Sequence, residues 1–402
     1  MDNAKQELQW LTASTATGSP VTFDTGAIDQ VLWAFRRRQA TLAHDKIYAL
    51  LELSNTCVLI VPNYKLPADH LYSGLAKSLI IRQQSPTYPL DHIGFTHNSE
   101  RVRRHTFPSW VPDRAYSPGD TNLLADYGPW SSTFSADDKI LESCHFLLQD
   151  LHDKVKSSRN NELEIMGVQL GTISKLCQHW ITESRWRESR VHDFLCKWQV
   201  LAYGENYNQV DDNQIDAFRR TILTDRCDDM RTRIVRIEEG GGKSRPAAAP
   251  EEIDASATTN LERVSIEFHS QLRPSYNRDE AKASPGPQVF LSPLERRLFG
   301  WRFGLTSQGH YSLVPSHSKE GDVICIPIGS STPFVLRPVL KEDGLSSEHC
   351  ELIGRCYVHD FMDGQAMASL RDALENEGVE ARSGLSVASE RIDAELKSFI
   401  LV

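Results

Sequence analysis

Three ionisable residues lie close together near the end of the last predicted strand. His359, Asp360 and Asp363 fall within the run His-Asp-Phe-Met-Asp. Closely spaced ionisable groups can push one another's pKa values apart, as a general acid and a general base require. The same run is also typical of a turn in which Asp363, followed by Gly364, hydrogen-bonds the backbone. We favour the turn and keep these three residues as candidate catalytic groups.

A second set of residues could bind a ligand or a partner. Asp45 can pair with the neighbouring Lys46 or with the basic run that begins at Arg36, and a structural ion pair is favoured over catalysis. Asp113 follows Pro112, where it could equally cap a turn. The candidate binding residues are Arg36, Asp45, Tyr48, Trp110, Asp113 and Tyr357.

Histidine and cysteine residues come closest to a metal-site pattern around residues 349–359. A zinc site usually has two cysteines about two to four residues apart, and the separation of Cys350 and Cys356 is wrong for that. On one strand both cysteines would face the same side, where cysteine often acts as a small apolar side chain. The sequence also has no Gly-x-Ser-x-Gly elbow and no phosphate-binding glycine loop. We therefore predict neither a metal site nor a cofactor.

The elements that position these residues are helical first and β-rich later. Apolar spacing predicts helices over residues 28–53, 71–83, 179–202 and 215–237. Alternating or β-branched runs predict strands over 163–168, 297–301, 310–314, 323–328, 334–337 and 350–358. The fold class predicted is α+β, with a mixed helical and β N-terminal unit and a small antiparallel β-barrel-like C-terminal unit.

Composition shifts divide the chain into five predicted segments. A stretch containing Gly240-Gly241-Gly242 and Arg245-Pro246 is too poor in large apolar side chains to fold by itself. The segments are a weakly structured N-terminus (1–27), a mixed unit (28–237), a flexible linker (238–260), a helix plus barrel-like unit (261–368) and a helical tail (369–402).

The overall charge excludes one broad class of function. Lys and Arg number 44 against 54 Asp and Glu, a net charge of −10, so a general nucleic-acid binder is not expected. No apolar run approaches the roughly 18 residues that cross a bilayer, and the N-terminus lacks a signal-peptide core. Eight scattered cysteines suit a reducing compartment. We expect a cytoplasmic protein, with a nuclear location left open.

Six sequence blocks together resemble proteins of the fungal heterokaryon-incompatibility (HET) family. The first reads RQATLAHDKIYALLEL, and the last, GRCYVHDFMDGQA, contains Tyr357, His359 and Asp360. The blocks occupy 38–53, 61–64, 107–113, 218–222, 321–337 and 354–366. The chain departs from the family pattern at His44, Glu52, Arg114 and Gln365.

The family's N-terminal core blocks have no counterpart in this sequence. The chain therefore resembles the region downstream of the HET core, as a natural short paralogue, a gene-prediction error or a deliberately shortened protein would. The resemblance implies that any NAD-cleaving or death-triggering activity would reside in the missing core.

Three functions remain open at this point. The first is an interaction or regulatory module in fungal non-self recognition, with a protein partner and neither a nucleic acid nor a membrane. The second is a small-molecule enzyme, or an accessory protein of a secondary-metabolite pathway, built on the same scaffold and taking a small-molecule ligand. The third is a non-functional fragment.

Overall fold

The computed structural model describes the helical and β segments discussed below. The described residues are 28, 31–32, 35, 38–53, 60–82, 108–112, 136, 153–155, 158, 162–178, 188–204, 210–225, 298, 300–340, 346–368 and 396–402. The predicted N-terminal segment 1–27, the predicted linker 238–260, Arg36 and Asp113 lie outside them.

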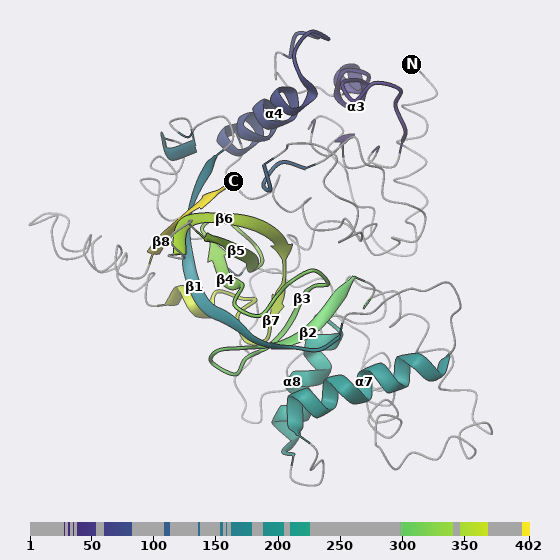
Figure 1. Ribbon diagram of the computed structural model, residues 1–402, viewed down its shortest axis with the longest axis vertical. Coiled ribbons are helices and arrows are strands. Elements are labelled where there is room, and N and C mark those ends of the chain that lie inside the picture. The colour runs from purple at the N-terminus through teal and green to yellow at the C-terminus, as the bar shows by residue number, and fades with distance from the viewer. Residues whose placement is uncertain are drawn as a thin grey trace, which may run out of the picture.

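Helices come mainly from the first half of the chain and strands mainly from the second (Figure 1). The first-half elements are α3 (Asp45–Tyr48), η1 (Leu51–Leu53), α4 (Ala68–Arg82), β1 (Leu163–Leu176), α7 (Glu188–Tyr203) and α8 (Asp212–Ile222). The second-half elements are β2 (Trp301–Thr306), β3 (Tyr311–Pro315), β4 (Val323–Pro327), β5 (Phe334–Leu340), β6 (Ser346–Arg355), β7 (Tyr357–Val358), η6 (Gln365–Met367) and β8 (Leu396–Leu401). The predicted α+β class is confirmed. Among the described helices, none has the length and apolar character needed to cross a membrane.

The eight strands in the described residues form one sheet that curls back on itself. Its order is β4-β5-β6-β8-β1-β2-β3-β7, and an additional pairing joins β4 to β1. The strands β1, β4, β5, β6 and β8 therefore pair in a closed circuit, visible in Figure 1. Strands β2, β3 and β7 extend from the far end of β1.

The strands of the predicted antiparallel C-terminal unit, β2 to β7, are antiparallel wherever they pair with one another, but β8 makes the sheet as a whole mixed. Strand β8 runs parallel to β6, with His349 opposite Ile400 and Cys350 opposite Leu401. A hairpin forces antiparallel pairing, but strands joined by a long connection can run in either direction. Strand β8 follows β7 only after such a connection.

Strand β1 is the element shared by both parts of the sheet. Its pairing with β4 shifts register between Gln169 and Gly171, and Gly171 has a φ of 130°. At Gly167 an added Cβ would lie 2.5 Å from the carbonyl oxygen of Ile326, so only glycine fits there. The strand continues to Leu176, past Val168, where the sequence predicted it to end.

The sheet draws strands from three of the predicted segments. Strand β1 belongs to the predicted mixed unit, and β8 belongs to the predicted helical tail. For residues 396–401 the predicted helix is wrong, because Phe399 and Leu401 enter the core as members of a strand. The boundaries between the five segments stay a prediction.

The predicted helix over residues 28–53 is not continuous. Residues 38–44 have no helical structure, and only the short α3 and η1 follow. Side chains from elsewhere take the carbonyl groups that a helix would use. Lys46 donates to the carbonyl of Arg38, and the Tyr72 hydroxyl donates to the carbonyl of Ala43 at 2.6 Å.

The short segment Pro108–Pro112 is hydrogen-bonded to β6 and to the residue that follows β8. The Ser109 amide donates to the carbonyl of Val402 at 2.8 Å, and the Leu352 amide donates to the Ser109 hydroxyl at 2.8 Å. The Trp110 ring is fully buried, with the Lys77 ammonium 5.7 Å from its centre. Trp110, a predicted binding residue, therefore lies in the core.

A separate apolar cluster joins α7 and α8 to the sheet. Trp198 of α7 stacks on Phe303 of β2 with ring centres 6.0 Å apart, and Phe218 of α8 meets the same ring edge-on at 5.2 Å. All three side chains are buried. This cluster fixes α8 against β3, which places its charged side chains near the end of β7.

Candidate functional site

Helix α8 carries the charged half of the candidate site. Asp211 caps the helix, accepting from the Gln214 amide at 2.8 Å, while the Gln214 side chain accepts from the Asp211 amide at 3.4 Å. One turn further on, Asp216 lies three and four residues before Arg219 and Arg220, the spacing at which helical side chains meet. Both arginines form ion pairs with Asp216. Arg220 Nε lies 2.6 Å from Asp216 Oδ2.

The turn that ends α8 is held by a buried ion pair. Arg220 Nη1 lies 2.5 Å from Asp225 Oδ1, and the two side chains are 5% and 4% exposed. The Asp225 amide also donates to the Arg220 carbonyl at 2.7 Å. Thr224 and Asp225 have φ values of 51° and 54°, in the left-handed region that side chains with a Cβ disfavour.

These contacts set the charge states of α8. Burial alone would raise the pKa of Asp216, but the hydrogen bond from Arg220 and the charges of Arg220, Arg219 and His359 outweigh it and lower the pKa. Burial likewise opposes the charge on Arg220, yet Asp225 and Asp216 raise its pKa. The helix therefore presents fixed charges at neutral pH.

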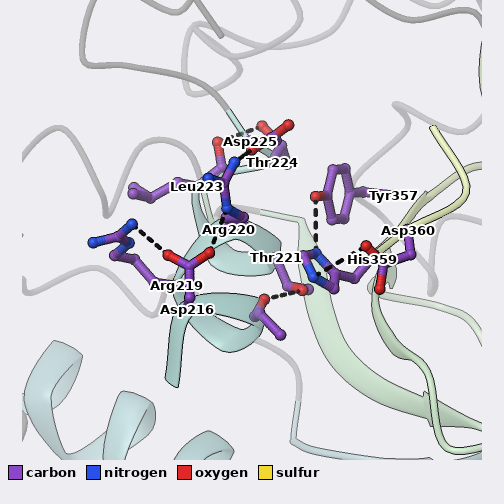
Figure 2. A network of polar contacts seen from close by, with 11 residues as sticks. Asp216, Arg219, Arg220, Thr221, Leu223, Thr224, Asp225, Tyr357, His359 and Asp360 are labelled. Carbon is purple, nitrogen blue, oxygen red and sulfur yellow. Dashed lines mark hydrogen bonds and ion pairs between the residues drawn. The ribbon is translucent and has the colours of Figure 1, made fainter. Parts of the chain in front are cut away.

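The end of β7 supplies the second half of the site. Figure 2 shows Tyr357, His359 and Asp360 beside α8, with the His359 ring near Thr221. His359 Nδ1 lies 3.4 Å from the Tyr357 hydroxyl, and His359 Nε2 lies 3.5 Å from Asp360 Oδ1. The His359 amide donates to the carbonyl of Tyr311 in β3 at 2.9 Å. We call Asp216, Arg219, Arg220 and Asp225, together with Tyr357, His359 and Asp360, the α8–β7 network.

The structure thus brings together three residues that the sequence singled out. Tyr357 is buried, His359 is 12% exposed and Asp360 is 53% exposed. Asp363 stands apart from them in the turn that follows, where its amide donates to the Gln365 side chain at 2.8 Å. The arrangement around His359 could pass a proton between Tyr357 and Asp360, although both distances are long for hydrogen bonds.

Sequence reasoning missed the residues of α8 that face this group. Residues 218–222 had been noted only as a motif, and the spacing of Asp216 and Arg220 was a usable signal for an ion pair. Asp225 gave no local signal, because its contact with Arg220 depends on the left-handed turn that follows the helix.

Asp45 and Tyr48 lie in a different place, in α3, which contacts the loop formed by residues 60–67. The Tyr64 hydroxyl donates to Asp45 Oδ1 at 2.8 Å, and the Tyr48 hydroxyl accepts from the Asn63 amide at 3.0 Å. His44 Nε2 lies 2.6 Å from the carbonyl oxygen of Leu66. The hydrogen bond to Asp45 is the main cause that raises the pKa of Tyr64.

Three large apolar side chains are exposed nearby, one in the segment 38–44 before α3 and two in the loop formed by residues 60–67. Leu42, Val61 and Tyr64 are 50%, 71% and 55% exposed. The rings of His44, Tyr48 and Tyr64 contact one another, with the Tyr48 and Tyr64 ring centres 5.2 Å apart. We call Leu42, Val61 and Tyr64 the loop surface.

The cysteine and histidine residues around 349–359 do not converge on a metal-like site. His349 lies 3.7 Å from a carboxylate oxygen of Glu162, and Cys350 and Cys356 are buried. Burial raises the pKa of the Cys350 thiol to about 11 and that of Cys356 well above its ordinary value. Within the described part of the chain, no group of His, Cys, Asp and Glu could hold a metal ion.

Comparison with known protein families gives a match in the region of the sheet. Residues 285–374 match the Het-6 beta-barrel domain. This HET-related family model covers β2 to β7 and η6, including Tyr357, His359 and Asp360. The resemblance to HET proteins is therefore confirmed for the C-terminal region. No curated protein and no solved structure gives a significant match to the chain.

Proposed function

We propose that this chain is a HET-related interaction module that takes part in fungal non-self recognition by binding a protein partner in the cytoplasm. The observation that carries the proposal is the match of residues 285–374 to the Het-6 beta-barrel domain. The six blocks that resemble HET proteins extend this relation to the rest of the chain.

The charged side chains of the candidate site favour a structural role over turnover. Asp216, Arg220 and Asp225 are engaged with one another, and the Thr221 hydroxyl donates to the carbonyl of Ala217 at 2.7 Å. A nucleophile needs a hydroxyl or thiol that a base can reach. A set of mutually paired groups is better suited to holding two parts of a protein together.

The loop surface is the place where we expect the partner to bind. Large exposed apolar side chains such as these three are suited to a protein interface, because covering them removes apolar area from water. Its polar neighbour Asp45 and the hydroxyl of Tyr64 can supply directional contacts at the rim.

A cell assay tests the proposal. The full chain is expressed in a filamentous fungus, and the fraction of fused compartments that take up a vital dye is compared with an empty vector, in compatible and incompatible pairings. We expect the chain to change this fraction severalfold in at least one pairing.

Matched variants locate the effect on the surface. Leu42→Ser, Val61→Ser and Tyr64→Ser combined should abolish the change. Val200→Ser with Val339→Ser, which alters exposed apolar residues elsewhere, should leave it intact. A chain that behaves like the empty vector in every pairing contradicts the function, and equal loss in both variants contradicts the surface.

A further inference from the structure

One exposed segment comes shortly before α3 and contains the first residue of the loop surface. Residues 38–42 have no helical or strand structure, and every side chain from Arg38 to Leu42 is exposed. The carbonyl of Arg38 accepts a hydrogen bond from Lys46, and the carbonyl of Leu42 accepts one from the Asp45 amide at 3.0 Å. Both ends of the segment are therefore hydrogen-bonded to α3, while the side chains between them lie in solvent.

The residue order in this segment is one that a class of enzymes reads. Thr41 follows Arg38 by three positions and precedes the apolar Leu42, and Arg36 and Arg37 come before them. Serine/threonine protein kinases that select basic substrates bind an arginine at this distance with carboxylates of their peptide groove, in the charge-assisted pairs that arginine forms well. Among the described serine and threonine residues, Thr41 is the one with arginine three positions earlier.

The surroundings of Thr41 also suit a kinase substrate. A kinase binds its substrate as an exposed chain, so a residue inside a helix or a strand must first be released by local unfolding. The segment 38–42 has no regular structure to lose. Thr221 in α8 and Thr332 before β5, by contrast, are fully buried. Thr41 is therefore accessible in the folded chain.

We propose that Thr41 is a phosphorylation site for a serine/threonine protein kinase that selects basic substrates, and that its phosphate blocks the loop surface. In the reaction, the Thr41 hydroxyl oxygen forms a bond to the γ-phosphorus of ATP, and the bond from that phosphorus to the β,γ-bridging oxygen breaks. ADP leaves, and the hydroxyl proton passes to a carboxylate of the kinase. The site itself stands on the exposure and the sequence of the segment, whereas the blocking effect rests on the proposed function of the loop surface.

A phosphate on Thr41 would change the charge of the loop surface directly beside Leu42. It carries about 1.5 to 2 negative charges at neutral pH. The Asp45 carboxylate, which accepts from the Tyr64 hydroxyl at 2.8 Å, already makes this region negative. A partner that covers Leu42 and Tyr64 would have to remove water from the phosphate, and the cost of burying that charge opposes binding. Phosphorylation should therefore release the partner.

Labelling of the folded full chain tests the site. The chain is incubated with ATP, Mg²⁺ and activated calcium/calmodulin-dependent protein kinase, which reads an arginine three residues before its target, and mass spectrometry locates the phosphate. We expect phosphate on Thr41, and a rate about tenfold lower for Arg38→Ala, the effect of one lost charge-assisted contact. Thr41→Ser keeps the hydroxyl and should be labelled at the same position, whereas Thr41→Ala should not.

Two results of the labelling overturn the site. One is a wild-type chain without phosphate on Thr41, and the other is an unchanged rate of labelling in Arg38→Ala.

The dye-uptake assay tests the effect on the loop surface. Thr41→Glu carries a negative charge and should abolish the change in the dye-positive fraction, whereas Thr41→Gln, which is neutral and of nearly the same size, should retain it. Equal activity of these two variants overturns the blocking effect. Labelling of Thr41 in a chain that changes no pairing upholds the site and removes the blocking effect together with the proposed function, so the two failures are distinguished.

Discussion

The α8–β7 network and the loop surface differ in where their polar and aromatic side chains point. In the network, the side chains of Arg220 and Asp225 are nearly inaccessible to water and meet each other. On the loop surface, Asp45 is paired with Tyr64, which is mostly in solvent. Both regions come from sequence blocks that resemble the same family. The same kind of sequence signal therefore marks a buried structural contact in one region and an accessible surface in the other.

This difference predicts a large stability cost for breaking the internal pair. Arg220→Met should lower the free energy of unfolding by about 3–5 kcal/mol, because the Asp225 carboxylate stays buried after losing its charged partner. Urea denaturation measures the change. Lys154→Met is the control: it removes an ion pair with Glu164 whose side chains are 27% and 30% exposed, and it should cost about 0–1 kcal/mol.

A double variant sharpens that result. Arg220→Met with Asp225→Asn removes both charges and should recover part of the loss, because no isolated charge is left in the interior and asparagine tolerates the left-handed backbone there. Equal costs for Arg220→Met and Lys154→Met would show that burial does not distinguish the two ion pairs.

Acid should act on the network through Asp216. Its pKa is lowered below the ordinary value of 3.8 by Arg220, Arg219 and His359, which outweigh burial. A carboxyl whose pKa is lowered on folding stabilises the protein above its unfolded pKa, and this contribution is lost as pH falls through the folded value. Urea midpoints measured at pH 5, 4 and 3 should therefore fall, and Asp216→Asn should make the fall shallower. An identical slope in the variant would exclude this contribution.

A smaller effect of opposite sign is expected where α8 ends. Thr224 has a φ of 51°, a conformation that costs about 1–2 kcal/mol for a residue with a Cβ, against an entropic cost of about 0.5–1 kcal/mol for glycine. Thr224→Gly should thus stabilise the protein by roughly 0.5 kcal/mol, seen as a higher thermal midpoint. Ala217→Gly in the same helix should instead destabilise it by about 1 kcal/mol. A lower midpoint for Thr224→Gly would mean that its side-chain contacts outweigh the strain.

The sequence predicted the positions of individual strands better than it predicted which strands pair with each other. Strands at 310–314 and 323–328 were found because β-branched and aromatic residues end at turn residues such as Gly321. Strand β8 was missed because its side chains fit a helix equally well, and only pairing with β1 and β6 decides between the two.

The candidate site shows the same limit. Tyr357, His359 and Asp360 are neighbours in the sequence, so their proximity in space could be predicted. Their contact with α8 could not, because α8 reaches them through the packing of Phe218 on Phe303, which no local pattern records. Long-range packing, rather than motif or periodicity, assembled the two halves of the network.

The smallest stability effect per substituted residue is expected on the loop surface, where the functional effect should be largest. Leu42→Ser, Val61→Ser and Tyr64→Ser should each change the free energy of unfolding by no more than about 0.5 kcal/mol, because each of these side chains is at least half exposed in the folded chain. The loss of the hydrogen bond from Tyr64 to Asp45 adds little, since solvent replaces it.

Urea denaturation of this triple variant and of Val200→Ser with Val339→Ser, beside the fungal dye-uptake assay, separates the two regions. A stable triple variant without activity assigns the surface to partner binding. If the triple variant loses as much free energy of unfolding as Arg220→Met, then Leu42, Val61 and Tyr64 stabilise the fold, and both regions are structural contacts.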